Sequence, residues 1–212
     1  MRGLLLNNYY SLQNNIKTSL GIALALLLVS FVAADHSVMN SIVAAQILIF
    51  SVSIGSSLQM DEASKWSKLE ITMPIQRKTV INAKYLSFIL LILTGSAVSI
   101  VTPALTYVRG IDTTHFNLST GFTFGLSLSI STISIYYPVI LKFGVEKSEM
   151  MIMVSAALSV AIRFLVWMLL GLLWKPVNFN GAETGYVSLI VAVVIFAVSY
   201  LLAVRIHRNK EF

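Results

Sequence analysis

Six long apolar stretches, separated by shorter polar ones, run the length of the chain. They cover residues 18–34, 38–57, 85–107, 118–141, 150–173 and 186–204. An α-helix needs about 20 residues to cross about 30 Å of hydrocarbon, and each stretch is near that length. The pattern therefore predicts an all-α membrane protein with six transmembrane helices, in which residues 1–212 form a single transmembrane domain.

Small and polar side chains distinguish the second and fourth stretches from the others. The second contains Gln46 among several serines, and the fourth contains Ser127, Ser129, Ser131 and Ser134. Because unpaired polar groups are costly in hydrocarbon, we expect both stretches to pack among other helices or to line a pathway.

Two glycines of the fourth stretch, Gly121 and Gly125, lie four residues apart. This spacing lets two helices approach closely, either within one chain or between two chains. We therefore treat both glycines as helix-contact candidates.

The polar residues before the first stretch have a helical pattern of their own. Leu5, Tyr9, Leu12 and Ile16 recur at helical spacing, while asparagines and a serine occupy another face. We predict an interfacial amphipathic helix over residues 1–16, in the headgroup plane; the alternative is an extension of the first span. We do not expect a cleaved signal peptide, because this polar lead is long for the basic region of one.

Composition supports the membrane assignment and limits the chemistry. Hydrophobic residues make up 57% of the chain and charged residues 11%, with a mean hydropathy of +0.82. Soluble domains carry about 25% charged residues. The absence of cysteine excludes disulfides, thiolate catalysis and cysteine-based metal sites.

Lys and Arg residues are distributed unevenly between the two sides of the predicted bundle. Only Arg109 and Lys175 fall on one side, and Arg163 lies within a span. The other side, which carries both termini, has Arg2, Lys17, Lys65, Lys68, Arg77, Lys78, Lys84, Lys142, Lys147, Arg205, Arg208 and Lys210. Short loops rich in Lys and Arg remain cytoplasmic, so both termini are predicted to be cytoplasmic. This placement explains the net charge of +6 without a nucleic-acid partner.

The longest polar stretch joins the second and third spans on the predicted cytoplasmic side. We predict a short helix over residues 61–73, because its acidic start favours a helix N-terminus and Pro74 ends it. One tryptophan among charged residues is typical of a docking hot spot for a protein partner. The alternative is an interfacial helix that uses this tryptophan as a membrane anchor. The candidate docking residues are Asp61, Glu62, Lys65, Trp66, Leu69 and Met73.

Residues 61–86 also carry a family resemblance. The sequence Asp-Glu-x-Ser-Lys-Trp is followed, from Thr72 to Leu86, by Thr-Met-Pro-Ile-x-Arg-Lys-x-Val-Ile-x-x-Lys-Tyr-Leu. Together with the six-span plan, this segment resembles small bacterial permeases of the ATP-binding cassette (ABC) type-2 exporter family. Members of that family include exporters of cytolytic or antimicrobial peptides, such as the phenol-soluble modulins. The resemblance implies a peptide-export permease in the bacterial cell membrane, with residues 61–73 as the coupling helix that docks on an ATPase.

The resemblance further implies partners that supply what this chain lacks. No Gly-x-x-x-x-Gly-Lys-Ser/Thr loop for binding phosphates occurs in the sequence, so ATP and Mg are expected on a separate ABC ATPase dimer. Six spans imply a second permease copy or paralogue in the same bilayer. We expect no catalytic residue, cofactor or metal site on this chain.

Three residues within the spans are unusual for membrane helices. Arg163 lies about halfway along the fifth stretch, where a charge is costly unless it faces protein or water. It is therefore a functional candidate, although bonds to serine hydroxyls or backbone carbonyls, or snorkelling, would equally explain it. Pro103 and Pro138 each remove a helix hydrogen bond and are expected to kink the third and fourth spans.

Three other functions are possible on sequence alone. An ion-coupled transporter is disfavoured because every Asp and Glu lies in a loop or at a span edge. An intramembrane protease built from His36, Asn40, Asp61 and Glu62 is disfavoured because the predicted topology separates these pairs across the bilayer. A non-transporting scaffold or immunity protein stays open as an alternative.

Overall fold

The computed structural model describes residues 2–32, 36–66, 77–108, 118–173 and 177–209. This part of the chain is helical and contains no β-strand. Its helices are α1 (Arg2–Val32), α2 (His36–Ala63), α4 (Arg77–Ser99), α5 (Val101–Val108), α6 (Leu118–Phe143), α7 (Ser148–Leu173) and α8 (Ala182–Asn209).

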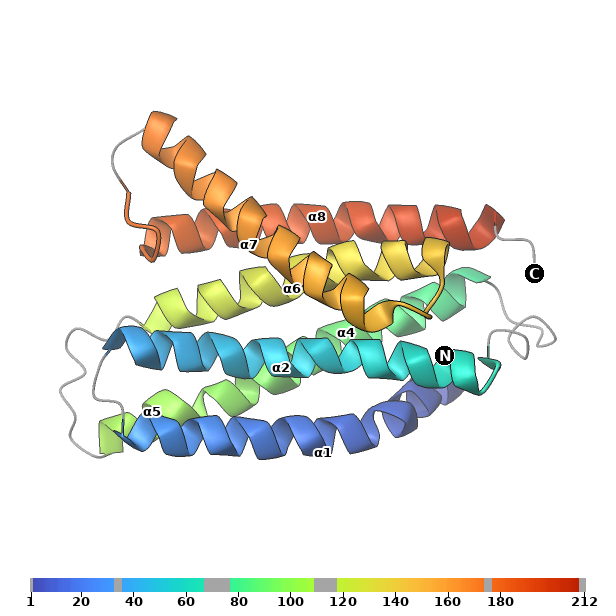
Figure 1. The fold of residues 1–212 in the computed structure, drawn as a ribbon, viewed down its shortest axis with the longest axis horizontal. Helices are drawn as coiled ribbons and strands as arrows, with labels where there is room; N and C mark the ends of the chain where they lie inside the picture. The colour runs from blue at the N-terminus through green and yellow to red at the C-terminus, as the bar shows by residue number, and fades with distance from the viewer. Residues whose placement is uncertain (1, 33–35, 67–76, 109–117, 174–176, 210–212) are drawn as a thin grey trace.

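Most of the helices run roughly parallel in an elongated bundle, and α7 crosses it obliquely (Figure 1). Six helical segments of the described chain are long and apolar enough to cross a membrane, with α4 and α5 contributing to one of them. The all-α, six-span prediction is therefore confirmed. α1 begins and α8 ends at the same end of the bundle, which we call the terminal end; we call the opposite one the far end (Figure 1).

The predicted amphipathic helix is the first half of α1, and no break separates it from the first span. α1 has 31 residues and is about 46 Å long, more than the hydrocarbon thickness. Figure 1 shows its N-terminal turns inclined to the rest of the helix. Thr18 donates a hydrogen bond to the Asn14 carbonyl at 3.0 Å, the kind of back-bonding that bends helices. Placement of these turns in the headgroup plane stays a prediction.

One face of the N-terminal half of α1 packs against the bundle. Leu4, Asn8 and Leu12 are buried, whereas Tyr9 is 55% exposed. This buried face includes the polar Asn8 because Asn8 has hydrogen-bond partners inside the bundle.

α2 and α6 are the two enclosed helices of the bundle. In an apolar 18-residue window of each span, the buried share of the window is 61% in α2 and 67% in α6. It is 17–33% in the other four spans. These are the two serine-rich spans, so their polar side chains lie among other helices. The remaining spans expose apolar side chains to their surroundings, as expected for helices that face lipid.

Glycines allow α6 to approach its neighbours closely. A Cβ atom at Gly125 would lie 2.9 Å from the Ala44 Cα atom of α2, and one at Gly121 would lie 2.9 Å from Asn40 Oδ1. The structure therefore places this glycine pair in a contact within the chain, between α6 and α2.

A cluster of aromatic rings joins α4, α6 and α8. Tyr85 packs edge-on against Tyr137, Phe196 and Tyr200, with ring centroids 5.1–5.4 Å apart. Its hydroxyl group lies 2.8 Å from Ser199 Oγ, so the polar end of the ring also has a partner. Edge-on pairs of this kind stabilise packing beyond the area that they bury.

The two span prolines have different effects. The third span is interrupted between Ser99 and Val101, and Pro103 follows directly in α5. A proline has no N–H for the carbonyl four residues earlier and its ring crowds that carbonyl, which explains a break at Ser99. Pro138 instead lies inside α6, which is one continuous helix.

We predict that Gly125→Ala lowers the free energy of unfolding by about 1–3 kcal/mol, because the added methyl group would collide with backbone atoms of α2. The measurement is the midpoint of thermal unfolding in detergent. Gly21→Ala in α1 is the control, since no atom lies within 4 Å of a Cβ there. Equal midpoints for the two variants would contradict the close contact of α6 with α2.

Candidate functional site: the polar network at the terminal end

The first residues of the predicted coupling helix belong to the end of α2. α2 continues through Asp61 and Glu62 to Ala63, and Lys65 then has a left-handed φ of 52°. The predicted helix start at Asp61 is therefore wrong. The helix dipole disfavours an acidic side chain in a last turn, but a cation beside Asp61 offsets this effect.

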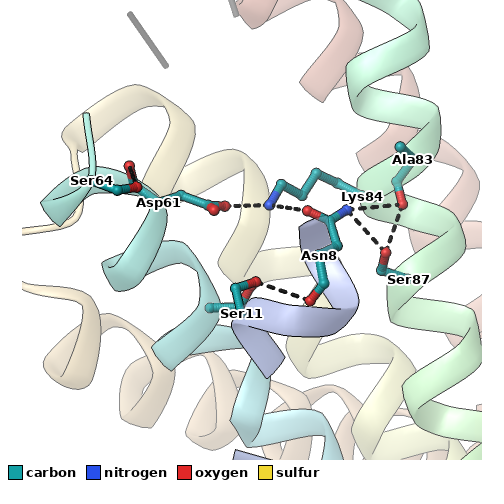
Figure 2. Close-up of polar contacts among 8 residues, drawn as sticks. Asn8, Ser11, Asp61, Ser64, Ala83, Lys84 and Ser87 are labelled. Carbon is teal, nitrogen blue, oxygen red and sulfur yellow. Dashed lines mark hydrogen bonds and ion pairs between the residues drawn. The ribbon is translucent and has the colours of Figure 1, made fainter. Parts of the chain in front are cut away.

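That cation is Lys84 of α4. Its ammonium group forms an ion pair with the Asp61 carboxylate and donates a hydrogen bond to Asn8 Oδ1 at 2.7 Å (Figure 2). The side chains of Lys84 and Asp61 are only 9% and 15% exposed. Little water is available to solvate either charge if the pair separates. The ion pair and its hydrogen bonds therefore keep the two groups together.

Asn8 extends the network to the backbone and side chains of α4. Its amide group donates to Ser87 Oγ at 3.1 Å and points toward the Ala83 carbonyl at 3.5 Å (Figure 2). Three helices, α1, α2 and α4, thus meet at one set of charged and amide groups. We call Asn8, Asp61, Lys84 and Ser87 the terminal network.

Hydrogen bonds between α1 and α2 continue from the terminal network toward the far end. Ser11 Oγ lies 3.1 Å from Ser57 Oγ, and Ser19 Oγ lies 2.7 Å from Ser53 Oγ. Further along, Gln46 donates to the Ala23 carbonyl at 3.1 Å. These polar contacts hold α1 against α2 over most of their shared length.

Trp66 lies beside the terminal network rather than standing free. It is half-buried against a small apolar cluster formed by Leu4, Val80 and Ala83. Glu62 and Lys65 are exposed at the same turn. Leu69 and Met73, the other two docking candidates, lie outside the described residues.

Arg163 occupies a second polar site, nearer the far end. It is 2% exposed and donates to Ser188 Oγ at 3.0 Å, to Ser127 Oγ at 3.3 Å and to the Phe179 carbonyl at 3.3 Å. The rings of Phe124 and Phe179 flank its guanidinium group, with centroids 4.4 Å and 5.3 Å from Cζ. Serine hydroxyls and a carbonyl thus surround the charge, as one of the sequence interpretations proposed.

Sequence reasoning missed the terminal network. Lys84 was counted only as a loop charge and Asn8 was not singled out, although Lys84 directly precedes an apolar span. Their pairing depends on the side-by-side placement of α1, α2 and α4, which no sequence spacing predicts.

Comparison with known proteins then decides the family. The family described as ABC-2 family transporter protein matches residues 3–208. The chain belongs to the ABC-2 transporter family. No curated protein and no solved structure matches it.

Family membership and the six apolar helices together make this chain an ABC-2 membrane permease. Such a permease is the transport component in the membrane, and the family in general implies an ABC ATPase as its partner. The terminal network lies at the terminal end of this permease, where α2 ends and α4 begins.

We predict that Lys84→Met destabilises this ABC-2 permease by about 3–5 kcal/mol, because Asp61 would keep an enclosed charge without its partner. The measurement is thermal unfolding in detergent. Lys78→Met is the control, since Lys78 is an exposed lysine on the same helix.

The double variant Asp61→Leu/Lys84→Met tests whether the charges act as a pair. We expect it to recover most of the lost stability, because no unpaired charge is left behind. A double variant as unstable as the sum of the two single variants would contradict the pairing.

Proposed function

We propose that this permease exports amphipathic, cytolytic or antimicrobial peptides across the bacterial cell membrane, driven by an ABC ATPase dimer docked at the terminal end. The terminal network is the observation that carries the proposal. It joins three helices at the place where α2 ends and α4 begins.

The network supports force transmission from a docked ATPase. An element that pushed on residues 61–73 would act first on the last turn of α2, which holds Asp61. Because Asp61 is paired with Lys84, and Lys84 with Asn8, the push would reach α1, α2 and α4 together. Rigid motion of packed helices is the usual form of transporter gating.

The distribution of Lys and Arg residues supports a cytoplasmic location for the terminal end. Exposed cations on helices or turns at this end include Lys65, Lys78, Lys142, Lys147 and Arg205. Lys and Arg concentrate on the cytoplasmic side of membrane proteins, so we place the terminal end and both termini there.

The substrate class and the second permease rest on the family resemblance of residues 61–86. We propose that a second copy of this chain, or a paralogue, lies beside it and completes the pathway. The exposed apolar faces of α1, α4, α7 and α8 leave room for such a neighbour as well as for lipid.

Ion coupling fits the described residues less well. Their carboxylates lie at helix ends or in turns: Asp61, Glu62, Glu146, Glu149 and Glu183. Coupling relays place carboxylates or histidines within the membrane. A shared catalytic water is also disfavoured, because Asn40 and Asp61 lie roughly 30 Å apart along α2 at 1.5 Å per residue.

Cross-linking tests the docking site directly. The chain has no cysteine, so Lys65→Cys provides a single thiol at the exposed turn after α2. We expect a thiol-reactive photo-cross-linker at this position to capture an ATP-binding protein in native membranes. Tyr107→Cys is the control, because Tyr107 is 74% exposed on α5 at the far end (Figure 1). Capture from Tyr107 but not Lys65 would refute docking at the terminal end.

Transport in cells tests the energy source and the substrate class. We expect a labelled amphipathic peptide to accumulate inside cells when ATP is depleted, but not when an ionophore dissipates the ion gradients. The reverse result would favour an ion-coupled transporter. No difference between cells with and without the permease would favour the scaffold or immunity alternative.

A further inference from the structure

A cavity of about 220 Å³ lies beside Arg163, near the far end of the bundle. It is lined by Asn40, Ser41, Thr120, Gly121, Phe124, Arg163 and Asn180. Since one water occupies about 30 Å³ in the liquid, the cavity can hold several waters or one small polar group. Among the described residues that line it, Arg163 is a cation and none is a carboxylate.

Arg163 has donors left over for a ligand. The described residues use three of its five N–H groups, two on Nη1 and one on Nη2. Its buried Nε atom has no hydrogen-bond partner among them. The Nε and Nη2 edge of a guanidinium group is a fork that binds two oxygens of a phosphate or carboxylate.

Two more features of the cavity fit a phosphate that carries hydroxyl groups. Thr120 and Gly121 belong to the first turn of α6, where the helix dipole favours an anion. Asn40 Oδ1 is buried with no partner in the described part of the chain, so it can accept a hydrogen bond from a ligand hydroxyl. The cavity therefore offers donors for an anion and one acceptor beside them.

The position of the cavity identifies the source of such a group. Asn40 and Gly121 each lie within the first five residues of their helices, α2 and α6, about 6 Å or less from the helix start. The candidate membrane spans that contain them begin at Val38 and Ser119, so both residues lie near a span edge, where lipid head groups are expected. Beside it, the half of α7 beyond Arg163 exposes Phe164, Leu165 and Met168, which can contact acyl chains.

We propose that this cavity binds the head group of an anionic phospholipid, with Arg163 holding the phosphate and Asn40 accepting from a head-group hydroxyl. Phosphatidylglycerol has this combination of groups. The proposal does not depend on the peptide substrate or on the ATPase.

Ligand-dependent thermal unfolding of the full chain in a neutral detergent tests the site. Dihexanoyl phosphatidylglycerol is expected to raise the unfolding midpoint of the wild type, and dihexanoyl phosphatidylcholine to have a much smaller effect. Arg163→Gln should weaken the apparent Kd for phosphatidylglycerol at least about tenfold, since a charged hydrogen-bonded contact is lost. Arg163→Lys, which keeps the charge but not the fork, should bind with an intermediate Kd.

A second pair of variants avoids substitution of the buried arginine. Asn180→Trp places a large side chain at an exposed position that lines the cavity and is expected to weaken binding. Asn178→Trp, exposed in the same loop but not lining the cavity, is the control and should bind like the wild type.

Three results would overturn the proposal. If glycerol phosphate binds with the same apparent Kd as the lipid, the cavity is a site for a free anion. A short apolar peptide that binds only with a free C-terminal carboxylate, while phosphatidylglycerol does not bind, would indicate a substrate site. Equal lipid affinity of the wild type and Asn180→Trp would show that the lipid binds elsewhere.

Discussion

A polar side chain inside a helix bundle that is surrounded by hydrocarbon must find its hydrogen-bond partner within the protein. Much of this bundle's internal contact surface follows from that constraint. Serines of α1 and α2 bond to one another across the helix interface, and Thr132 of α6 donates to Ser159 of α7 at 3.1 Å. Small residues serve two purposes here, because they let helix backbones approach and their hydroxyl groups then reach a partner.

Charged groups meet the same constraint in two ways. Lys84 has a carboxylate and an amide within reach, so its charge is neutralised by an ion pair. Arg163 is surrounded by serine hydroxyls, a carbonyl and aromatic rings, and no described carboxylate forms an ion pair with it. The first arrangement is complete in itself and ties helices together. The second leaves positive charge and an unused N–H beside a cavity, which is the condition for binding an anion.

The fold was largely predictable because membrane helices are marked by length and apolarity alone. Six spans follow from that signal, and the enclosed position of the serine-rich ones follows from their polar side chains. The inward face of α1 was not predictable in the same way. The apolar pattern of residues 1–16 predicted a face toward the membrane, whereas the face that packs against the bundle contains Asn8, whose partners lie on a helix 75 or more residues away.

The candidate sites were predictable only in part. Arg163 was found because a charge in an apolar span is conspicuous, but its serine and phenylalanine neighbours come from α6, α8 and the turn before α8. Asp61 was identified as a docking residue from its acidic neighbourhood, which suggested a helix start. The structure instead ends α2 there, because a lysine 23 residues away stabilises a carboxylate in the last turn.

α2 is the element that connects the two polar sites. Asp61 lies in its last turn, within the terminal network, and Asn40 lies near its start, at the cavity beside Arg163. A hydrogen-bonded helix does not stretch appreciably along its axis, so an axial displacement of α2 at one end appears at the other. Gly121 holds α2 against α6 at the cavity and Gly125 does so one turn further along, and a shift of α2 must therefore either move α6 with it or change these contacts. α2 is thus an enclosed helix that runs from the terminal network to the far-end cavity.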